Sequence, residues 1–409
     1  MRDDFVPLLF AGDINVYSIA RAFHEEYGIK SCAFGKYPVW PVAGSKILDY
    51  TANPMADDQE VFMELIRDFA SRNKSKKVIL QGCGDSYVRL VSRNLKGMPD
   101  NVIAPCIGID MLDSLIHKEK FYAMCEKTGI SFPSTFVHMK DMGRRFELPF
   151  DAPFIIKPSN GIEYWDHPFT EQKKVFRASS RSSLEKILDS IYGSGYGDSI
   201  IIQDLIPGDD SFMRVLTSYS DKTGKVRMMC LGHVMLEEHT PHGIGNHAVI
   251  VTAHNRELEN RFRELLEGMN YIGYSNFDIK YDMRDGKYKA FEINVRPGRS
   301  NFYVTAAGEN VARYIVDDYI DGKSSECKFV TNESLWLVVP KKVALSYVPH
   351  EGHRAKMRKL FKEGNYVNPL KYGPDSGLLR KLRFIKSQFG HFYKYKKYLG
   401  KGGGPCDVD

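Results

Sequence analysis

Polar side chains occupy every second position in two runs within residues 275–300, and apolar side chains lie between them. The polar positions are Asn276, Asp278, Lys280, Glu292, Asn294 and Arg296. Successive side chains of a strand point to opposite faces, so this alternation predicts two strands that each place their polar residues on one face. Two carboxylates, an amide and a guanidinium would then share one face of a hairpin.

The turn decides whether Asp278 and Glu292 share that face. A two-residue turn at Asp285-Gly286 would place them on opposite faces. A three-residue loop, 284–286, would pair Asp278 with Glu292, and it favours glycine at its third position, where the backbone is left-handed. Because Gly286 stands there, we expect the three-residue loop.

The chemistry of this shared face favours a bound cation. Two directly opposed carboxylates repel each other, and a cation between them removes that repulsion. Oxygen ligands with an adjacent amide suit magnesium, which usually also binds substrate phosphates. Asp278, Glu292 and Asn294 are therefore candidate magnesium ligands. From this hairpin alone, an ordinary amphipathic hairpin with a solvated charged face is an equally good interpretation.

Length and composition indicate a globular protein of several domains. The 409 residues suffice for two or three domains with apolar cores. The seven cysteines form no CxxC pair and have no histidine at metal spacing, so we expect reduced thiols and no zinc site. No apolar run reaches the roughly 20 residues that cross a bilayer, and the N-terminus does not read as a signal peptide. We therefore expect a cytoplasmic location.

The net charge of +6 is unevenly distributed. Residues 341–409 contain 16 Lys or Arg and 5 Asp or Glu, whereas the rest of the chain contains 41 and 46. This basic segment predicts an anionic partner. Its interleaved aromatic residues fit an anionic membrane face, a nucleic acid or an anionic soluble substrate, and also a solvated helical cap on the core. No nucleic-acid-binding motif is present, which argues against a nucleic acid.

Strands and helices alternate over the first hundred residues. We expect strands at 5–11, 31–34 and 77–81, and helices at 16–27, 60–72 and 87–95. This order predicts a small parallel α/β unit. Further along, we expect a helix at 114–128, strands at 154–158 and 199–203, and a loop at 204–210.

Five motifs follow one another in an order that resembles the ATP-grasp superfamily of carboxylate–amine ligases. They are Lys118, FIIKPSNG with Lys157, QDLIPGDD, FDIKYD and FEINVRPG. The resemblance covers residues 5–325, and the order of the motifs is more specific than any single motif. It implies a fold of α/β and α+β parts, with two lobes that clamp ATP.

The resemblance also implies domain boundaries. A Rossmann-like pre-ATP-grasp domain would occupy residues 1–113, and the ATP-grasp domain would occupy residues 114–325. Within the latter, the small lobe would span about 132–202 and the large lobe about 203–325. A basic C-terminal extension would occupy residues 326–409.

ATP and Mg²⁺ are the cofactors that the resemblance implies, and it suggests roles for single residues. Lys118 and Lys157 would contact the nucleotide phosphates. The hinge that binds adenine through its backbone would be Gln203, Asp204, Leu205 and Ile206. Asp210 would hold the ribose, and the magnesium ligands would be Asp278, Glu292 and Asn294. The catalytic residues would be Lys157 and Arg296, with Arg296 facing the transferred phosphate and the acyl-phosphate.

The chain departs from the superfamily pattern at two places. The first hinge residue is usually Glu, whereas here it is Gln203, whose amide can still accept from the adenine amino group. The loop after Lys157 usually carries several glycines, but SNGIEYWDHPF carries one, and backbone amides approach phosphates less freely without glycine. Lys173 and Lys174 would replace that contact with side-chain charge, or else lie on a solvated strand face.

Three further stretches resemble the D-aspartate ligase family across nearly the whole chain. They are GDINVYSIARAFHEEYG, EYWDHPF followed by KKVF, and HTPHGIGNHA. The resemblance implies that the side-chain carboxylate of D-aspartate is activated as an acyl-phosphate and joined to the lysine amine of a peptidoglycan precursor, with release of ADP and phosphate. Another amino-acid donor or another amine acceptor also fits the motifs. A non-catalytic nucleotide-binding protein, or a binder of anionic polymers, is disfavoured by the intact set of acids, amide and lysines.

The partners implied are D-aspartate, or another amino acid, and a lysine-containing muramyl peptide, with no nucleic acid. Substrate contacts are expected at Gly245, Asn246 and His247, in a loop that would form a lid or a plain turn. Arg299 and Ser300 would meet the donor, with Arg299 binding its α-carboxylate or forming a structural salt bridge. Tyr164, Trp165 and His167 would line the acceptor side or pack the small lobe. The basic segment is compatible with peripheral contact at the inner membrane face.

Overall fold

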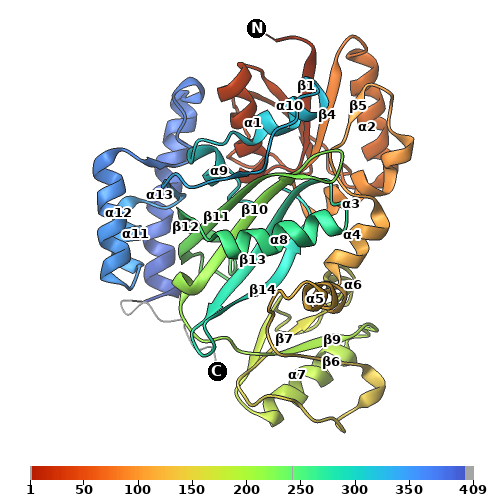
Figure 1. Cartoon of the computed structure of the whole chain (residues 1–409), viewed down its shortest axis with the longest axis vertical. Helices are drawn as coiled ribbons and strands as arrows, with labels where there is room; N and C mark the ends of the chain where they lie inside the picture. The colour runs from red at the N-terminus through yellow and green to blue at the C-terminus, as the bar shows by residue number, and fades with distance from the viewer. Residues whose placement is uncertain (1, 242, 401–409) are drawn as a thin grey trace. The chain divides into compact units, whose positions relative to one another are not determined.

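An almost entirely apolar run forms the first strand, β1 (Phe5–Phe10), as a strand buried on both faces of a parallel sheet requires. The computed structural model, shown in Figure 1, describes residues 2–241 and 243–400. The described residues fall into two compact units, and each is treated by itself below. The first contains those of Met1–Leu112, Asp209–Phe277 and Asn294–Asp409, and the second contains Asp113–Gly208 and Asp278–Ile293.

The first unit begins with a parallel five-stranded sheet in the order β3-β2-β1-β4-β5. The other strands are β2 (Ser31–Gly35), β3 (Leu48–Ala52), β4 (Lys77–Gly82) and β5 (Val102–Ile103), with helices α1 (Ile14–Tyr27), α2 (Gln59–Arg72) and α3 (Asp85–Asn94). The predicted parallel α/β unit is thus confirmed. The sequence gives no signal for β3, because most of this edge strand is exposed and it lacks an apolar run.

A second, eight-stranded sheet has the order β14-β13-β10-β11-β12-β16-β17, and β15 pairs with β11. Its strands are β10 (Met213–Ser220), β11 (Val226–Glu237), β12 (His247–Ala253), β13 (Gly273–Asp282), β14 (Lys287–Asn294), β15 (Lys328–Phe329), β16 (Leu335–Leu337) and β17 (Tyr366–Val367). Helix α8 (Arg256–Gly268) packs across β10 and β11 (Figure 1). The short strands β15 to β17 come from beyond residue 325, so the C-terminal extension of residues 326–409 contributes to the same sheet.

Three helices of the basic segment stand together in the first unit: α11 (Lys341–Tyr347), α12 (Glu351–Glu363) and α13 (Leu378–Tyr398) (Figure 1). Asp375 anchors the start of α13 and is fully buried. Its carboxylate accepts from Tyr17 Oη at 2.8 Å, Ser45 Oγ at 2.9 Å and the Lys46 backbone at 2.5 Å. It also lies 3.1 Å from Arg380. None of the helices in the described ranges is long and apolar enough to span a membrane.

The second unit contains a four-stranded antiparallel sheet in the order β6-β9-β7-β8. The strands are β6 (Thr135–His138), β7 (Phe154–Pro158), β8 (Phe176–Ala178) and β9 (Ile200–Asp204). Helix α7 (Arg181–Gly193) buries Leu184, Leu188 and Ile191 in the core of this unit. A Ser180 capping box satisfies the first amide groups of the helix.

Two expectations for the second unit are wrong in detail. The single helix expected at 114–128 is two helices, α4 (Ile109–Ile116) and α5 (Lys118–Lys127), because His117 has an extended backbone. The glycine-poor stretch after Lys157 is not a plain loop, because it contains the short helix α6 (Gly161–Asp166). Tyr164 of α6 is buried in the core, and its hydroxyl donates to the Lys173 carbonyl at 2.7 Å. Of the two roles offered for Tyr164, packing is the one that its position supports.

The turn of the predicted hairpin is one residue longer than expected. Strand β13 ends at Asp282 and β14 begins at Lys287, and the Gly286 amide donates to the Asp282 carbonyl at 2.9 Å. The three-residue loop was therefore wrong, although Gly286 does adopt the left-handed conformation, with φ of 70°.

Candidate active site

A half-buried lysine is the centre of the charged group in the second unit. Lys157 lies on β7, and its Nζ is 4.9 Å from the centre of the Phe291 ring. Burial is the main reason that the pKa of Lys157 is lowered to about 8; the nearby charges of Lys118 and Lys174 add to this shift, whereas Glu292 and Asp278 oppose it. Both predicted carboxylates therefore lie within electrostatic range of the same lysine.

Lys118 completes this group from the first residue of α5. Its Nζ lies 3.9 Å from Glu292 Oε2, and both side chains are partly exposed. The sequence had predicted that Lys118 lies within a longer helix, but the break at His117 makes Lys118 the first residue of α5. Two cations and two carboxylates at partly exposed positions form a surface that can bind polyphosphate and a hard cation together.

The donor set fits magnesium in chemistry and number. Asp278 and Glu292 supply carboxylate oxygens, and Asn294 follows Glu292 on the same strand with an amide oxygen. Across the described ranges, no three His, Cys, Asp or Glu side chains gather as metal ligands. Magnesium usually keeps several waters and also binds substrate phosphates, so protein side chains supply only part of its coordination.

The predicted hinge strand is held from its buried side. The Gln203 amide nitrogen donates to Tyr122 Oη at 3.0 Å and to Thr135 Oγ1 at 2.9 Å. The Tyr122 hydroxyl in turn donates to the Phe291 carbonyl at 2.8 Å, on the strand that carries Glu292. Gln203 therefore links the hinge, through Tyr122, to the strand that carries Glu292. Its replacement of the glutamate that is usual at this position had not predicted this structural role.

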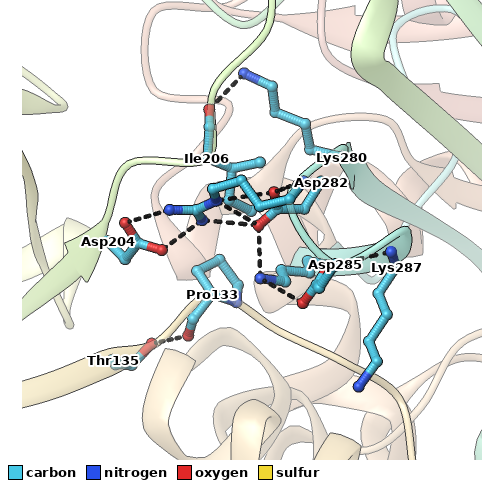
Figure 2. Close-up of polar contacts among 10 residues, drawn as sticks. Pro133, Thr135, Asp204, Ile206, Lys280, Asp282, Asp285 and Lys287 are labelled. Atoms are coloured by element: carbon cyan, nitrogen blue, oxygen red, sulfur yellow. Dashed lines mark hydrogen bonds and ion pairs between the residues drawn. The ribbon is translucent and has the colours of Figure 1, made fainter. Parts of the chain in front are cut away.

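Beyond Gln203, the hinge is held by ion pairs and carbonyl contacts from the hairpin turn (Figure 2). Arg284 binds the Asp204 carboxylate with both ends of its guanidinium, at 3.1 and 2.5 Å. Lys280 donates to the carbonyls of Ile206 at 3.0 Å and of Gly208 at 2.8 Å. Sequence reasoning missed both cations, although Lys280 shares the polar alternation that identified Asp278.

Arg284 is itself fixed by a buried carboxylate. Asp282 is fully buried and lies 2.7 Å from Arg284 Nη2 and 2.6 Å from Lys289 Nζ. The hydrogen bond from Arg284 is the main reason that the pKa of Asp282 lies well below its usual range. This network fixes the backbone from Asp204 to Gly208, where adenine contacts are expected.

The first unit carries the other predicted site residues. Asp210, at the start of a 3-10 turn, accepts from His239 Nε2 and from the Glu237 amide, each at 2.8 Å. Arg296 forms an ion pair with Asp85 in the first turn of α3, at 2.6 and 3.2 Å. Arg296 also donates to the Asn294 amide oxygen at 3.3 Å. Neither His239 nor Asp85 was predicted as a site residue, although His239 is the first residue of the HTPHGIGNHA stretch.

Arg299 has a buried nitrogen suited to an anionic ligand. Its Nη2 lies 3.5 Å from Glu238, whereas its Nη1 is buried and has no hydrogen-bond partner in the part of the chain that the structure describes. Desolvation raises the pKa of the nearby Asp13 carboxyl, and the charges of Arg299 and Arg296 oppose that rise. An anionic group from a substrate would satisfy the remaining donor.

The predicted lid residues lie at the start of β12 and directly before it. His247 begins β12 and is buried, and Gly245 has a left-handed backbone, with φ of 86°. Burial, with a smaller contribution from the charge of Arg299, lowers the pKa of His247 to about 4, so the imidazole is neutral at pH 7. The Asn246 carbonyl accepts from the Glu238 amide at 2.8 Å. Ser300 is buried, and His242 of the same motif lies outside the described residues.

Lys173 and Lys174 are exposed residues that precede β8. The positive charge of Lys174 lowers the pKa of Lys157, which shows that Lys174 lies within electrostatic range of the charged group. No contact of the Lys173 ammonium links it to that group, so its phosphate role stays a prediction.

Comparison with known proteins agrees with this geometry. The chain is 39% identical over 411 residues to a D-aspartate ligase of Enterococcus faecium (strain Aus0004), and the match covers 97% of each chain. No family model matches the sequence.

Solved structures with the same fold are ligases and related enzymes. An N5-carboxyaminoimidazole ribonucleotide synthetase in complex with ADP superimposes with a TM-score of 0.60 at 12% identity, over 96% of this chain and 97% of that one. An L-amino acid ligase from Bacillus licheniformis has a TM-score of 0.53 at 14% identity, over 78% and 74%. These structures confirm the predicted ATP-grasp fold.

Proposed function

Because the chain belongs to the D-aspartate ligase family, we propose that it joins the side-chain carboxylate of D-aspartate to a lysine amine of a muramyl peptide, with ATP and Mg²⁺. The family establishes a ligase that forms a C–N bond between a carboxylate and an amine. The observation that carries the finer proposal is the 39% identity over 97% of both chains. The grouping of Lys118, Lys157, Asp278 and Glu292 supports the ATP-dependent part.

Activation of the carboxylate is the demanding step. A carboxylate is a poor electrophile, so its oxygen attacks the γ-phosphorus of ATP and ADP leaves, which forms an acyl-phosphate. The lysine amine then attacks the acyl carbon, an amide forms and phosphate leaves. The protein must mainly position the reactants and stabilise charge on the phosphoryl group.

The charged group in the second unit suits that task. Lys118 and Lys157 would bind phosphate oxygens, and the phosphates would favour the ammonium form of Lys157. Asp278, Glu292 and Asn294 would hold magnesium, which when bound neutralises charge on the β- and γ-phosphates. Gln203 to Ile206 would bind adenine, and Asp210 would bind the ribose.

Residues of the first unit would bind the donor and the acyl-phosphate. A guanidinium matches forked oxygens better than an ammonium does, so Arg296 would bind the acyl-phosphate. Arg299 would bind the α-carboxylate of D-aspartate with its unpartnered Nη1. Gly245, Asn246, His247 and Ser300 would complete the donor site. Since ATP and nucleotide-linked precursors are cytoplasmic, we place the reaction in the cytoplasm.

A phosphate-release assay tests this proposal. The protein is incubated with ATP, magnesium, a nucleotide-linked muramyl pentapeptide that contains lysine, and one amino acid from a panel of D and L forms. We expect phosphate only with D-aspartate, together with a mass gain of one aspartyl residue on the peptide. Release with another amino acid keeps the ligase and discards this donor. No release with any pair, despite measurable ATP binding, contradicts the catalytic proposal.

A further inference from the structure

One helix of the first unit exposes an unusual number of apolar side chains. Of the seventeen large apolar side chains exposed among the described residues, seven lie on α13, with exposed fractions of 41–75%. They are Leu378, Leu379, Leu382, Ile385, Phe389, Phe392 and Tyr393. Their spacing of three or four residues over four turns aligns them as one stripe, which we call the α13 outer stripe.

The opposite side of the same helix is already used for packing. Arg380, His391 and Tyr395 are buried and recur at helical spacing. Tyr395 Oη donates to the Glu237 carbonyl at 2.6 Å, and Arg380 donates to the Pro41 carbonyl at 3.0 Å. These contacts fix the helix by its inner face, so the outer stripe is not needed to hold α13 on the protein. The outer stripe is therefore an exposed apolar surface on a helix that is already held by its other face, and an exposed apolar surface of this kind is typical of a docking site.

Charge identifies the chemistry of that partner. Helix α13 carries seven Lys or Arg residues and no Asp or Glu. At 100° per residue, Lys381 falls on one border of the outer stripe, and Lys386 and Lys397 fall on the other. Within the described residues, none of these three lysines forms an ion pair with a carboxylate, and Lys397 lies 4.9 Å from the centre of the Tyr398 ring. An apolar stripe between cationic borders is the pattern of a helix that lies in the surface of an anionic bilayer.

We propose that the α13 outer stripe docks the protein, peripherally and reversibly, on an anionic phospholipid bilayer. The stripe would enter the boundary between headgroups and acyl chains, and the bordering lysines would extend to the lipid phosphates. From Leu378 to Tyr393 the helix is about 22 Å long, so several apolar side chains can insert together. This function is separate from the ligase reaction and does not depend on it.

Two other partners fit the surface less well. A second copy of α13 would bring fourteen cations and no carboxylate to one interface, which like-charge repulsion opposes. A nucleic acid would satisfy the cations, but it offers little surface to Leu382, Ile385 and the other aliphatic side chains of the stripe. Only a bilayer offers apolar depth and anionic headgroups at the same face.

Vesicle flotation with the full-length protein tests the proposal. The vesicles are phosphatidylcholine alone or phosphatidylcholine with phosphatidylglycerol at about three to one. We expect binding to the anionic vesicles and at least tenfold weaker binding to the neutral ones, with a further decrease as salt rises. No binding to anionic vesicles at low salt would overturn the proposal.

Two variants locate the binding surface. Phe389→Asp should weaken binding to anionic vesicles at least tenfold, whereas Met55→Asp, at an exposed apolar residue elsewhere in the first unit, should leave it unchanged. Lys386→Gln with Lys397→Gln should weaken binding by a similar factor, and Lys74→Gln with Lys96→Gln should not. Equal effects of the test and control variants would contradict the assignment to α13.

A last control separates a lipid surface from a protein one. Sedimentation of the wild type and of Phe389→Asp without vesicles should show the same molecular mass. Self-association that Phe389→Asp abolishes would overturn the lipid assignment and assign the stripe to a dimer. Phosphate-release activity without vesicles should be the same in both proteins, because α13 carries no residue of the proposed active site.

Discussion

Two side chains in the second unit carry the chemical argument at the scale of single residues. Lys157 is a half-buried lysine, and Glu292 lies within its electrostatic range and within 3.9 Å of Lys118. Removing one carboxylate from such a group changes the charge that a metal and a polyphosphate meet, but it leaves the apolar core intact. Catalysis should therefore be far more sensitive than stability to substitution here.

Glu292→Ala should lower the turnover number at least a hundredfold, because it removes a proposed magnesium ligand and its transition-state stabilisation. Phosphate release measures the turnover, and circular dichroism checks the fold. Glu126→Ala, at an exposed carboxylate of α5 in the same unit, is the matched control and should retain wild-type turnover. Normal turnover in a folded Glu292→Ala protein would remove Glu292 from the metal site.

The hinge network belongs to the scale of elements, because β13 and the turn that follows it hold the end of β9 and the segment after it. Arg284 contributes no predicted substrate contact, yet it fixes Asp204, and Lys280 fixes two carbonyl groups beyond it. Loss of this support would leave the adenine segment more mobile before ATP binds. The free-energy cost of ordering this segment would then weaken ATP binding, and it would change the rate of the chemical step much less.

Arg284→Met should raise the KM for ATP about tenfold and leave the turnover number within about threefold. Arg284→Lys should recover part of the affinity, since a lysine can pair with Asp204 but cannot bind both of its oxygens. Arg145→Met, at an exposed arginine of the same unit, is the control. Equal losses of turnover and affinity in Arg284→Met would indicate general damage to the fold.

A second prediction at this scale concerns the anchor of the C-terminal helices. Asp375→Asn should lower the free energy of unfolding by about 3 kcal/mol, because it leaves Arg380 buried without its carboxylate and mismatches several donors. Urea unfolding measures the change. Asp285→Asn, at a more exposed carboxylate, should cost under about 1 kcal/mol. A loss below about 1 kcal/mol in Asp375→Asn would show that the anchor is weak.

Local sequence patterns predicted some secondary-structure elements correctly and missed others. Period-two alternation identified the two strands of the hairpin, β13 and β14, and both Asp278 and Glu292 lie within electrostatic range of Lys157. The turn length, the break at His117 and the edge strand β3 depend on hydrogen bonds that composition does not encode. The contacts of Asp375 with Tyr17 join residues 358 positions apart, and no local pattern predicts such a pair.

At the scale of the whole molecule, two buried groups make stability depend on pH in opposite directions. Burial lowers the pKa of His391 to about 4, so the unfolded chain binds the extra proton below about pH 6.5 and stability falls toward pH 4. Burial raises the pKa of Glu259 to about 7, so the folded chain keeps its proton longer and stability falls as the pH rises from 4.5 to 7.

The two effects can be separated by substitution. His391→Gln should reduce the loss of stability between pH 8 and pH 5 by about 2 kcal/mol. Glu259→Gln should reduce the cost of high pH and so stabilise the protein at pH 8 relative to the wild type, by about 2 kcal/mol. Urea unfolding at both pH values checks the two variants. Changes that are the same at pH 5 and pH 8 would show that neither group titrates on unfolding.

The first unit is assembled from three separate stretches of chain, and its last strands and helices come from beyond residue 325. During synthesis, α1 therefore emerges long before the Asp375 carboxylate that Tyr17 will bind. Until β16 has been translated, the side of β12 that will pair with it has no strand partner in the incomplete sheet. The first unit can therefore be completed only after the strands and helices beyond residue 325 have been translated.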